Sequence, residues 1–190
     1  MSMREERIRI VEPDPKWPER FAEERRRLES VLAPWLDGGV HHVGSTAVPG
    51  LAAKPTIDIL AGVTSLEASR PAIPILEQEG WAYFPYRPEE MHWFCKPSPQ
   101  RRDFHLHLVP TTAERFLDEL AFRDALQADH DLARAYALLK RELAARYADD
   151  REGYTQAKAG FITDVLRTRR EIRGSSLSAI PPGRRSTPPG

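Results

Sequence analysis

The spacing of apolar positions along the chain predicts strands in its first half and helices in its second. Apolar residues at helical spacing predict a helix over residues 16–31, and Pro18 suits its first turn. A further helical stretch should end near Gly80. Strands that come mainly first and helices that come last favour an α/β fold of the α+β type, a mixed β-sheet flanked by helices. The expected strands cover 8–11, 40–43, 56–62, 81–86, 91–96 and 103–109, and the later helices cover 112–125, 130–147 and 151–169.

Helix-start signals and composition set the expected limits of the domain. Thr111 with Glu114 forms a capping-box pattern, and Asp129 and Asp150 are suitable N-cap residues. Residues 171–190 are rich in Pro, Ser and Arg and have little apolar surface to bury, so this tail is predicted to be disordered. We therefore expect a single folded domain over residues 1–170.

Charge and cysteine content narrow the function classes. Lys plus Arg and Asp plus Glu each number 28, so the chain lacks the basic excess that nucleic-acid or anionic-membrane binding would need. Cys95 is the only cysteine, which excludes an internal disulfide and suits a reducing compartment. The sequence has no signal-peptide pattern and no apolar run long enough to span a bilayer, so we expect a cytoplasmic protein.

The segment from His42 to Leu60 carries the strongest chemical signal. An apolar run ends in Gly44-Ser45, a loop of small residues containing Lys54 follows, and the next apolar run carries Asp58. Backbone amides and a hydroxyl at such a turn can hold a phosphate, while an acid on the neighbouring strand can hold its metal. Lys54 is the expected phosphate contact, because a lysine in an otherwise small, apolar loop suggests charge complementarity.

This segment resembles the signature of the GrpB-like family, a branch of the nucleotidyltransferase superfamily that is also found fused to some dephospho-CoA kinases. The resemblance covers about residues 8–168. It implies a nucleotidyltransferase-like mixed sheet with a C-terminal helical segment that closes over a nucleotide. The other matching stretches are His105-Leu106-His107-Leu108-Val109, Phe122-Arg123-Asp124, Tyr136 with Leu139-Lys140, and Tyr154-Thr155-Gln156-Ala157-Lys158 with Phe161-Ile162.

For the helical segment, the resemblance implies lysines on the triphosphate, for which Lys140 and Lys158 are candidates, and Tyr154 stacked on the base. Tyr154 and Lys158 are four residues apart and share a face of a continuous helix. The alternative is that Tyr154 packs in the helix interface and Lys158 covers it.

The metal site departs from the superfamily pattern. The superfamily usually has a second acid two residues after the first, but Leu60 stands there. If the strand of Asp103 neighbours that of Asp58, as the resemblance implies, His105 and His107 could converge with Asp58 on a divalent metal. The expected cofactor is a divalent metal, Mg²⁺, Mn²⁺ or Zn²⁺. Two histidines with a carboxylate would prefer Zn²⁺, Mn²⁺ or Fe²⁺ over Mg²⁺, because imidazole suits the softer transition metals. Alternatively one histidine acts as general base, or both are hydrogen-bonded within the fold.

Two functions remain open on the sequence alone. The first is a metal-dependent nucleotidyltransferase that binds NTP and transfers a nucleotidyl group to a small acceptor. The second is a non-catalytic domain that binds a nucleotide or another phosphorylated metabolite with a degenerate metal site. Leu60 favours the second function, whereas the histidine pair favours retained metal chemistry.

Overall fold

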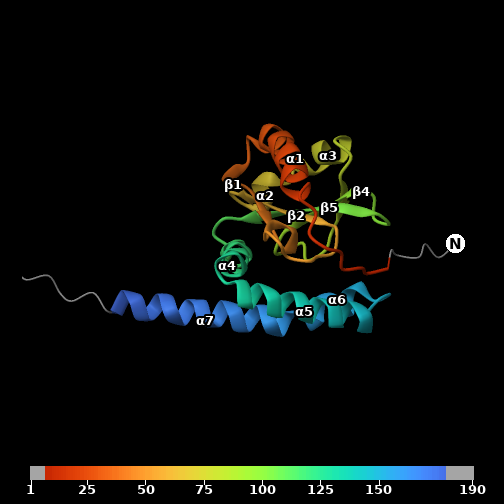
Figure 1. Cartoon of the computed structure of the whole chain (residues 1–190). Helices are drawn as coiled ribbons and strands as arrows, with labels where there is room; N and C mark the ends of the chain where they lie inside the picture. The colour runs from red at the N-terminus through yellow and green to blue at the C-terminus, as the bar shows by residue number, and fades with distance from the viewer. Residues whose placement is uncertain (1–6, 179–190) are drawn as a thin grey trace, which may run out of the picture.

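One mixed β-sheet organises the protein (Figure 1). The computed structural model describes residues 7–178, with side chains through residue 171. The five strands lie in the order β1-β2-β5-β4-β3; β2 and β5 run parallel, and the other neighbouring pairs run antiparallel. Their bounds are β1 Leu36–Val43, β2 Ile57–Val63, β3 Ala82–Phe84, β4 His92–Pro97 and β5 Arg102–Pro110. The expected mixed sheet is confirmed.

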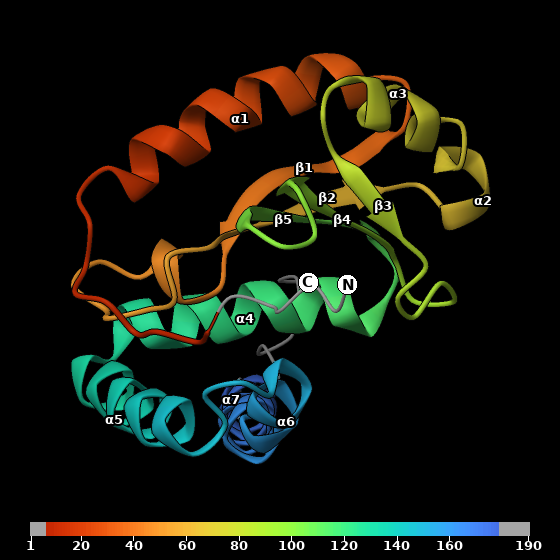
Figure 2. The ribbon, with the colours of Figure 1, turned by 90° about the vertical axis from the view of Figure 1, so that its right-hand side faces the viewer.

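One face of the sheet packs beneath α1 (Trp17–Leu32) and α3 (Ala72–Gln78), with the short α2 (Leu66–Ser69) beside them (Figure 2). Successive side chains of a strand point to opposite faces. A slip by one residue would therefore carry Asp58 into this apolar layer, so the packing fixes the register of β2. The central strands contribute Ile57, Ile59, Ala61, Val63, Leu106 and Leu108 to this core.

The opposite face of the sheet lies against α4 (Glu114–Ala128), which follows β5 directly (Figure 2). Leu60 is fully buried in this second layer, with Trp93 and Cys95 of β4 and Phe116 of α4. Position 60, where the superfamily usually has an acid, is thus an apolar core position. On this face α4 covers the region around Leu60, whereas the start of β2 and β5 carries the polar side chains of Asp58 and His105.

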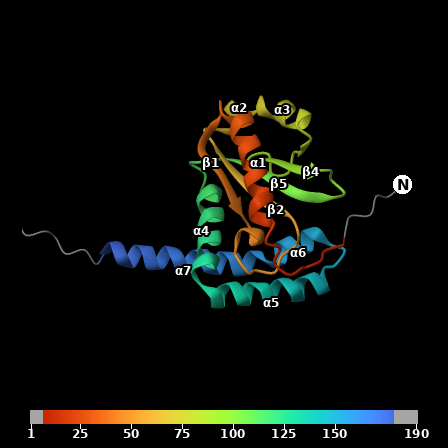
Figure 3. The ribbon, with the colours of Figure 1, turned by 45° about the horizontal axis from the view of Figure 1, so that its top comes forward.

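The C-terminal helices form a separate layer beyond α4. They are α5 (His130–Arg146), α6 (Arg151–Ala157) and α7 (Ala159–Ser178), and α7 extends past the rest of the domain (Figures 1 and 3). Their apolar core also takes Val48 and Leu51 from the connection between β1 and β2. This packing places the Gly44-Ser45 loop between the sheet and the helical layer. No helix among residues 7–178 is both long enough and apolar enough to cross a membrane.

Some predicted boundaries are corrected by the structure. Residues 8–11 form no strand, apart from an isolated bridge between Val11 and Ala53, because Ile8 packs on the C-terminal helices instead. The predicted helix over 151–169 is two helices that meet at Lys158, and the second continues to Ser178. Residues 171–178 are therefore helical where the sequence predicted a disordered tail, and residues 179–190 lie outside the described residues.

The helix caps show where local signals succeed. Asp129 accepts hydrogen bonds from the backbone of Asp131 and Leu132 at the start of α5, and Asp150 accepts one from Gly153, so both N-caps are confirmed. The capping box at Thr111 is wrong: α4 begins without a side-chain cap, and the Thr111 hydroxyl donates to Asp37 at 2.5 Å.

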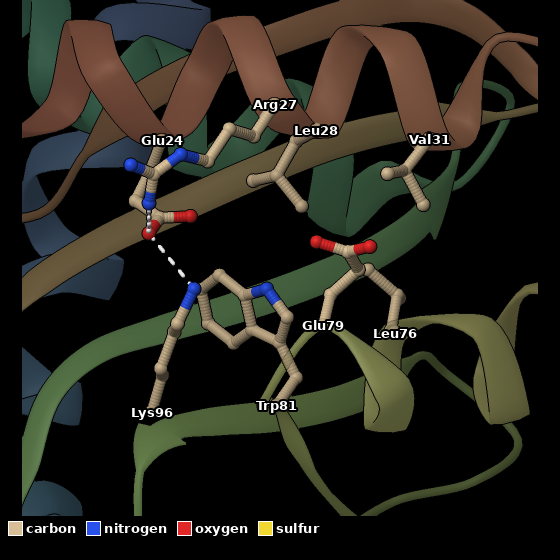
Figure 4. A pocket seen from close by; sticks show the side chains of 8 residues that line it. All are labelled: Glu24, Arg27, Leu28, Val31, Leu76, Glu79, Trp81 and Lys96. Atoms are coloured by element: carbon tan, nitrogen blue, oxygen red, sulfur yellow. Dashed lines mark hydrogen bonds and ion pairs between the residues drawn. The ribbon is translucent and has the colours of Figure 1, made fainter.

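A buried carboxylate, that of Glu24, links α1 to β4 of the sheet (Figure 4). Glu24 is 4% exposed, and its Oε1 accepts from Lys96 Nζ at 2.9 Å and from Arg27 at 3.2 Å. The Lys96 amine also lies 5.3 Å from the centre of the Trp81 ring. Since a buried charge is costly unless it is paired, this cluster is a structural ion pair.

Candidate active site

Asp58 and His105 lie side by side near the start of the two parallel strands. The register pairs Asp58 of β2 with His105 of β5, which confirms that these strands are neighbours. His105 Nδ1 lies 2.9 Å from Asp58 Oδ1, and the two side chains are 17% and 31% exposed. The pair is therefore sheltered but reachable from solvent through Asp58.

The electrostatics of this pair fix its protonation. Burial alone would raise the pKa of Asp58, but the hydrogen bond from His105 and the charge interactions with His105, His107 and Lys158 outweigh it and hold that pKa at about 2. Burial lowers the pKa of His105 despite the Asp58 charge. Near neutral pH a neutral imidazole thus donates its Nδ1–H to a carboxylate. Its Nε2 is buried and has no hydrogen-bond partner among the described residues.

His107 turns away from Asp58 to a second carboxylate. Its Nδ1 lies 3.2 Å from Oε2 of Glu119 on α4, and Oε1 of Glu119 accepts from Arg115 at 2.9 Å. Burial would raise the pKa of Glu119, but His107 and Arg115 bring it below its usual value, and its charge interacts with that of Asp58. The sequence interpretation missed Glu119. Arg115 and Glu119 have ion-pair spacing on a helix, but nothing in the sequence connects them to position 107.

The donor set limits the metals that could bind here. Among residues 7–178 no group of three or more His, Cys, Asp or Glu side chains is arranged to hold a metal. His105 and His107 each direct Nδ1 to a different carboxylate, so they do not share one point with Asp58. Such a set does not resemble a transition-metal site made of protein ligands alone. An Asp58 oxygen combined with substrate phosphates and water does suit Mg²⁺.

The Gly44-Ser45 turn abuts the Asp58 carboxylate. Gly44 has φ 69° and ψ −169°, a conformation that is almost exclusive to glycine, and a Cβ at this position would clash with Asp58. Ser45 opens a short 3-10 helix (η1, Ser45–Ala47), and its side chain interacts with the buried Tyr136 phenol. Behind the turn, His42 Nε2 lies 2.9 Å from Thr46 Oγ1, so His42 buttresses the loop.

Lys54 lies between Asp58 and a group of arginines. Burial, together with the charges of Arg151 and Arg102 and against the opposing charge of Asp58, lowers the pKa of Lys54 to about 8. The ammonium group therefore experiences both the carboxylate of the site and the positive charge beyond it. This position is compatible with the expected phosphate contact.

The residues expected on the helical side divide into two groups. Lys158 interacts electrostatically with Asp58, and its Nζ lies 4.3 Å from the centre of the Tyr154 ring. Tyr154 itself is 5% exposed and packs in the helical core, as the alternative interpretation expected. Lys140 is 2% exposed and donates to the carbonyl of Ala52 at 2.6 Å, so it tethers the loop to α5. The structure thus gathers Gly44, Ser45, Lys54 and Lys158 about Asp58, whereas Lys140 and Tyr154 are held in packing contacts.

Comparisons with known proteins identify sequences to which this chain is similar. The family model described as GrpB protein matches residues 7–168. A UPF0157 protein of Pseudomonas aeruginosa, PA4798, is 39% identical over 85% of this chain, which spans 67% of that relative. A protein of Mycolicibacterium paratuberculosis named dephospho-CoA kinase is 27% identical; the alignment covers 84% of this chain but 45% of that protein.

Solved structures extend the comparison to the fold. The crystal structure of the conserved protein GrpB from Enterococcus faecalis aligns with a TM-score of 0.78 at 30% identity, and covers 87% of this chain and 99% of that one. The structure of the GLD-2/RNP-8 complex aligns with a TM-score of 0.53 at 14% identity, over 77% of this chain and 51% of that one. At 14% identity this likeness concerns the fold alone.

Proposed function

The chain belongs to the GrpB family, and from that premise we propose that it is a cytoplasmic, metal-dependent nucleotidyltransferase that binds NTP and transfers a nucleotidyl group to a small acceptor. One observation carries the proposal: the Asp58 carboxylate, fixed by His105 at 2.9 Å, lies directly against the Gly44-Ser45 turn. A carboxylate suited to a metal ion and a turn suited to a phosphate are thus adjacent, which supports the proposal.

In this proposal the turn holds the triphosphate and the lysines balance its charge. The backbone at Gly44 can approach a phosphate closely because no side chain intervenes, and the Ser45 hydroxyl adds a hydrogen bond. Lys54 and Lys158 both interact with Asp58 and can contact the same phosphates. Asp58 would hold Mg²⁺, which when bound would neutralise the charge that develops as the α-phosphate is attacked.

His105 has a positioning role in this scheme. Its Nδ1–H occupies Asp58 Oδ1 and leaves Oδ2 directed at the Gly44 backbone. A hydrogen-bonded neighbour of a metal ligand fixes the ligand's orientation and tunes its affinity.

A second candidate function is supported by Leu60. Because Leu60 is fully buried where a second acid would stand, β2 contributes only one carboxylate, that of Asp58, to the site. A domain that binds a phosphorylated metabolite without catalysis would need no second acid. In that case ligand binding would not depend on a divalent metal.

Calorimetric titration with ATP, GTP, CTP and UTP, each with and without Mg²⁺, Mn²⁺ or Zn²⁺, separates the two functions. The proposed enzyme should bind at least one NTP in a metal-dependent manner and release pyrophosphate when a suitable acceptor is present. Asp58→Asn should abolish the metal dependence, while Asp131→Asn, at an exposed position of α5, serves as a control. Binding that is identical with and without metal would support the second function instead.

A further inference from the structure

Two helices far along the chain contact the Gly44-Ser45 turn and the loop that follows it. This 44–53 loop lies against α4 and α5 (Figure 2). Its apolar residues Val48 and Leu51 are buried in the core that α4, α5 and α7 form. The conformation of the loop therefore depends on these helices as well as on the sheet.

Helix α4 donates two hydrogen bonds to backbone carbonyls near the turn. Arg123 Nη1 donates to the carbonyl of His42 at 3.1 Å, and Gln127 Nε2 donates to the carbonyl of Ala47 at 2.8 Å. Arg123 and Gln127 are four residues apart, so they lie on the same face of α4. Their two acceptors stand on either side of Gly44-Ser45.

Helix α5 contacts the loop through a second pair of residues at the same spacing. Tyr136 interacts with the side chain of Ser45, and Lys140 Nζ donates to the carbonyl of Ala52 at 2.6 Å. The Lys140 amine also lies 4.8 Å from the centre of the Tyr136 ring, so the two side chains orient each other. The pair therefore fixes the loop near both of its ends.

The backbone hydrogen bonds within the loop are longer than those that the helices donate to its carbonyls. The amides of Ala47, Val48 and Leu51 donate to carbonyls three residues earlier, at 3.3, 3.2 and 3.2 Å. Hydrogen bonds at this spacing also have poorer geometry than those of an α-helix. By contrast, the carbonyls of Ala47 and Ala52 accept at 2.8 and 2.6 Å from Gln127 and Lys140. Local bonding alone thus does not explain the conformation of the turn.

We propose that four residues of α4 and α5 are positioning residues of the candidate site: Arg123, Gln127, Tyr136 and Lys140. They set the conformation in which the Gly44-Ser45 turn meets a phosphate, and they act through the loop rather than by contact with the ligand. Their effect on a ligand rests on the proposed function, whereas the order that they impose on the loop does not. The family-matching stretches that contain Arg123, Tyr136 and Lys140 thereby gain a role.

Amide hydrogen exchange of the full chain without ligand tests the order of the loop. Gln127→Ala alters an exposed side chain and removes one of the hydrogen bonds to the loop. The amides of Ala47, Val48 and Leu51 should then exchange about two- to tenfold faster, because the loop opens more readily without this bond. Tyr136→Phe, which keeps the aromatic ring, should act in the same direction.

Two controls separate this effect from a general loss of stability. Gln78→Ala, at an exposed position at the end of α3, should leave the exchange of the loop unchanged. Amides of the edge strand β3 should keep their wild-type rates in every variant, because their local opening does not involve α4 or α5. The proposal is overturned if the loop exchanges at wild-type rates in both Gln127→Ala and Tyr136→Phe, or if β3 accelerates as much as the loop.

A double-mutant cycle on nucleotide binding tests whether this positioning matters to a ligand. The affinities for ATP, GTP, CTP and UTP are measured by calorimetry with Mg²⁺. Tyr136→Phe should weaken binding by about two- to tenfold in the wild type but not in Ser45→Ala, since Tyr136 acts through Ser45. Equal losses in both backgrounds would indicate a purely structural effect and overturn the role of Tyr136. A wild type that binds none of the four nucleotides would contradict the proposed function alone, because the exchange experiment needs no ligand.

Discussion

Replacing Gly44 with alanine should both destabilise the protein and disturb Asp58. Gly44 combines φ 69° with ψ −169°, and a Cβ there would lie 3.1 Å from Cβ and Cγ of Asp58 and closer still to Oδ2. The backbone conformation costs an alanine about 1–3 kcal/mol. Forcing a methyl group against a packed side chain costs typically about 1–3 kcal/mol more. The free energy of unfolding should therefore fall by about 2–6 kcal/mol.

Comparison with Gly50→Ala separates the cost of the backbone conformation from the cost of the clash with Asp58. Gly50 also has a positive φ, of 74°, but no atom lies within 4 Å of a Cβ built there. This control should lose only the conformational term, about 1–2 kcal/mol. The difference between the two variants in urea-unfolding experiments then measures the clash with Asp58, and we expect about 1–3 kcal/mol.

A double-mutant cycle connects this clash to the carboxylate. In an Asp58→Ala background Cγ and the carboxylate oxygens are gone and only Cβ remains at 3.1 Å from the added methyl, so Gly44→Ala should cost less there than in the wild type. Coupling between contacting residues is typically about 0.5–3 kcal/mol. If Gly44→Ala costs no more than Gly50→Ala, or if the cycle shows no coupling, the close approach of the turn to Asp58 is refuted.

Three further outcomes follow from the same structure. His105→Gln should lower metal-dependent NTP affinity by about 10- to 100-fold while leaving NTP binding without metal unchanged, as calorimetry can show; equal losses in both would contradict a positioning role. Lys140 has a pKa lowered to about 7, chiefly by burial. The unfolded chain therefore binds a proton that the folded protein lacks between pH 7 and the usual lysine range, so this residue should make stability rise with pH in that window. Urea unfolding at several pH values should show a shallower rise for Lys140→Met, and an unchanged slope would argue against the lowered pKa. Lys96→Met leaves the buried Glu24 carboxylate without its 2.9 Å partner and should cost about 3–5 kcal/mol, whereas Lys96→Met with Glu24→Gln should recover much of this loss.

The fold was largely accessible from the sequence because its signals are local. Alternating apolar residues predicted β2 and β5, helical spacing predicted α1, and side-chain caps predicted the starts of α5 and α6 at Asp129 and Asp150. The errors occur where tertiary packing replaced a local preference. Ile8 lies in the helical core rather than in a strand, and Thr111 bonds to Asp37 rather than to its own helix.

The residues of the candidate site also divide into those that the sequence could identify and those that it could not. The Gly44-Ser45 turn, Lys54 and Asp58 lie within one continuous segment, so spacing and residue type alone could mark them. Lys140 and Lys158 looked equivalent in the sequence, yet one is hydrogen-bonded to a carbonyl in the core and the other interacts with Asp58. Residue type does not reveal which of two helical lysines faces a site, because the answer depends on how the helices break and pack.

By itself, the sequence determined the family, the mixed sheet and the composition of the Gly44-Ser45 turn, since motifs and periodicity depend on residues that are close together in the chain. Only the tertiary structure decided that His107 pairs with Glu119 instead of Asp58, because residues from β5 and α4 meet through packing of the helix on the sheet. It also brought polar side chains of α4 and α5 to the backbone of the loop between β1 and β2. Such convergence depends on long-range packing, which spacing along the chain does not encode.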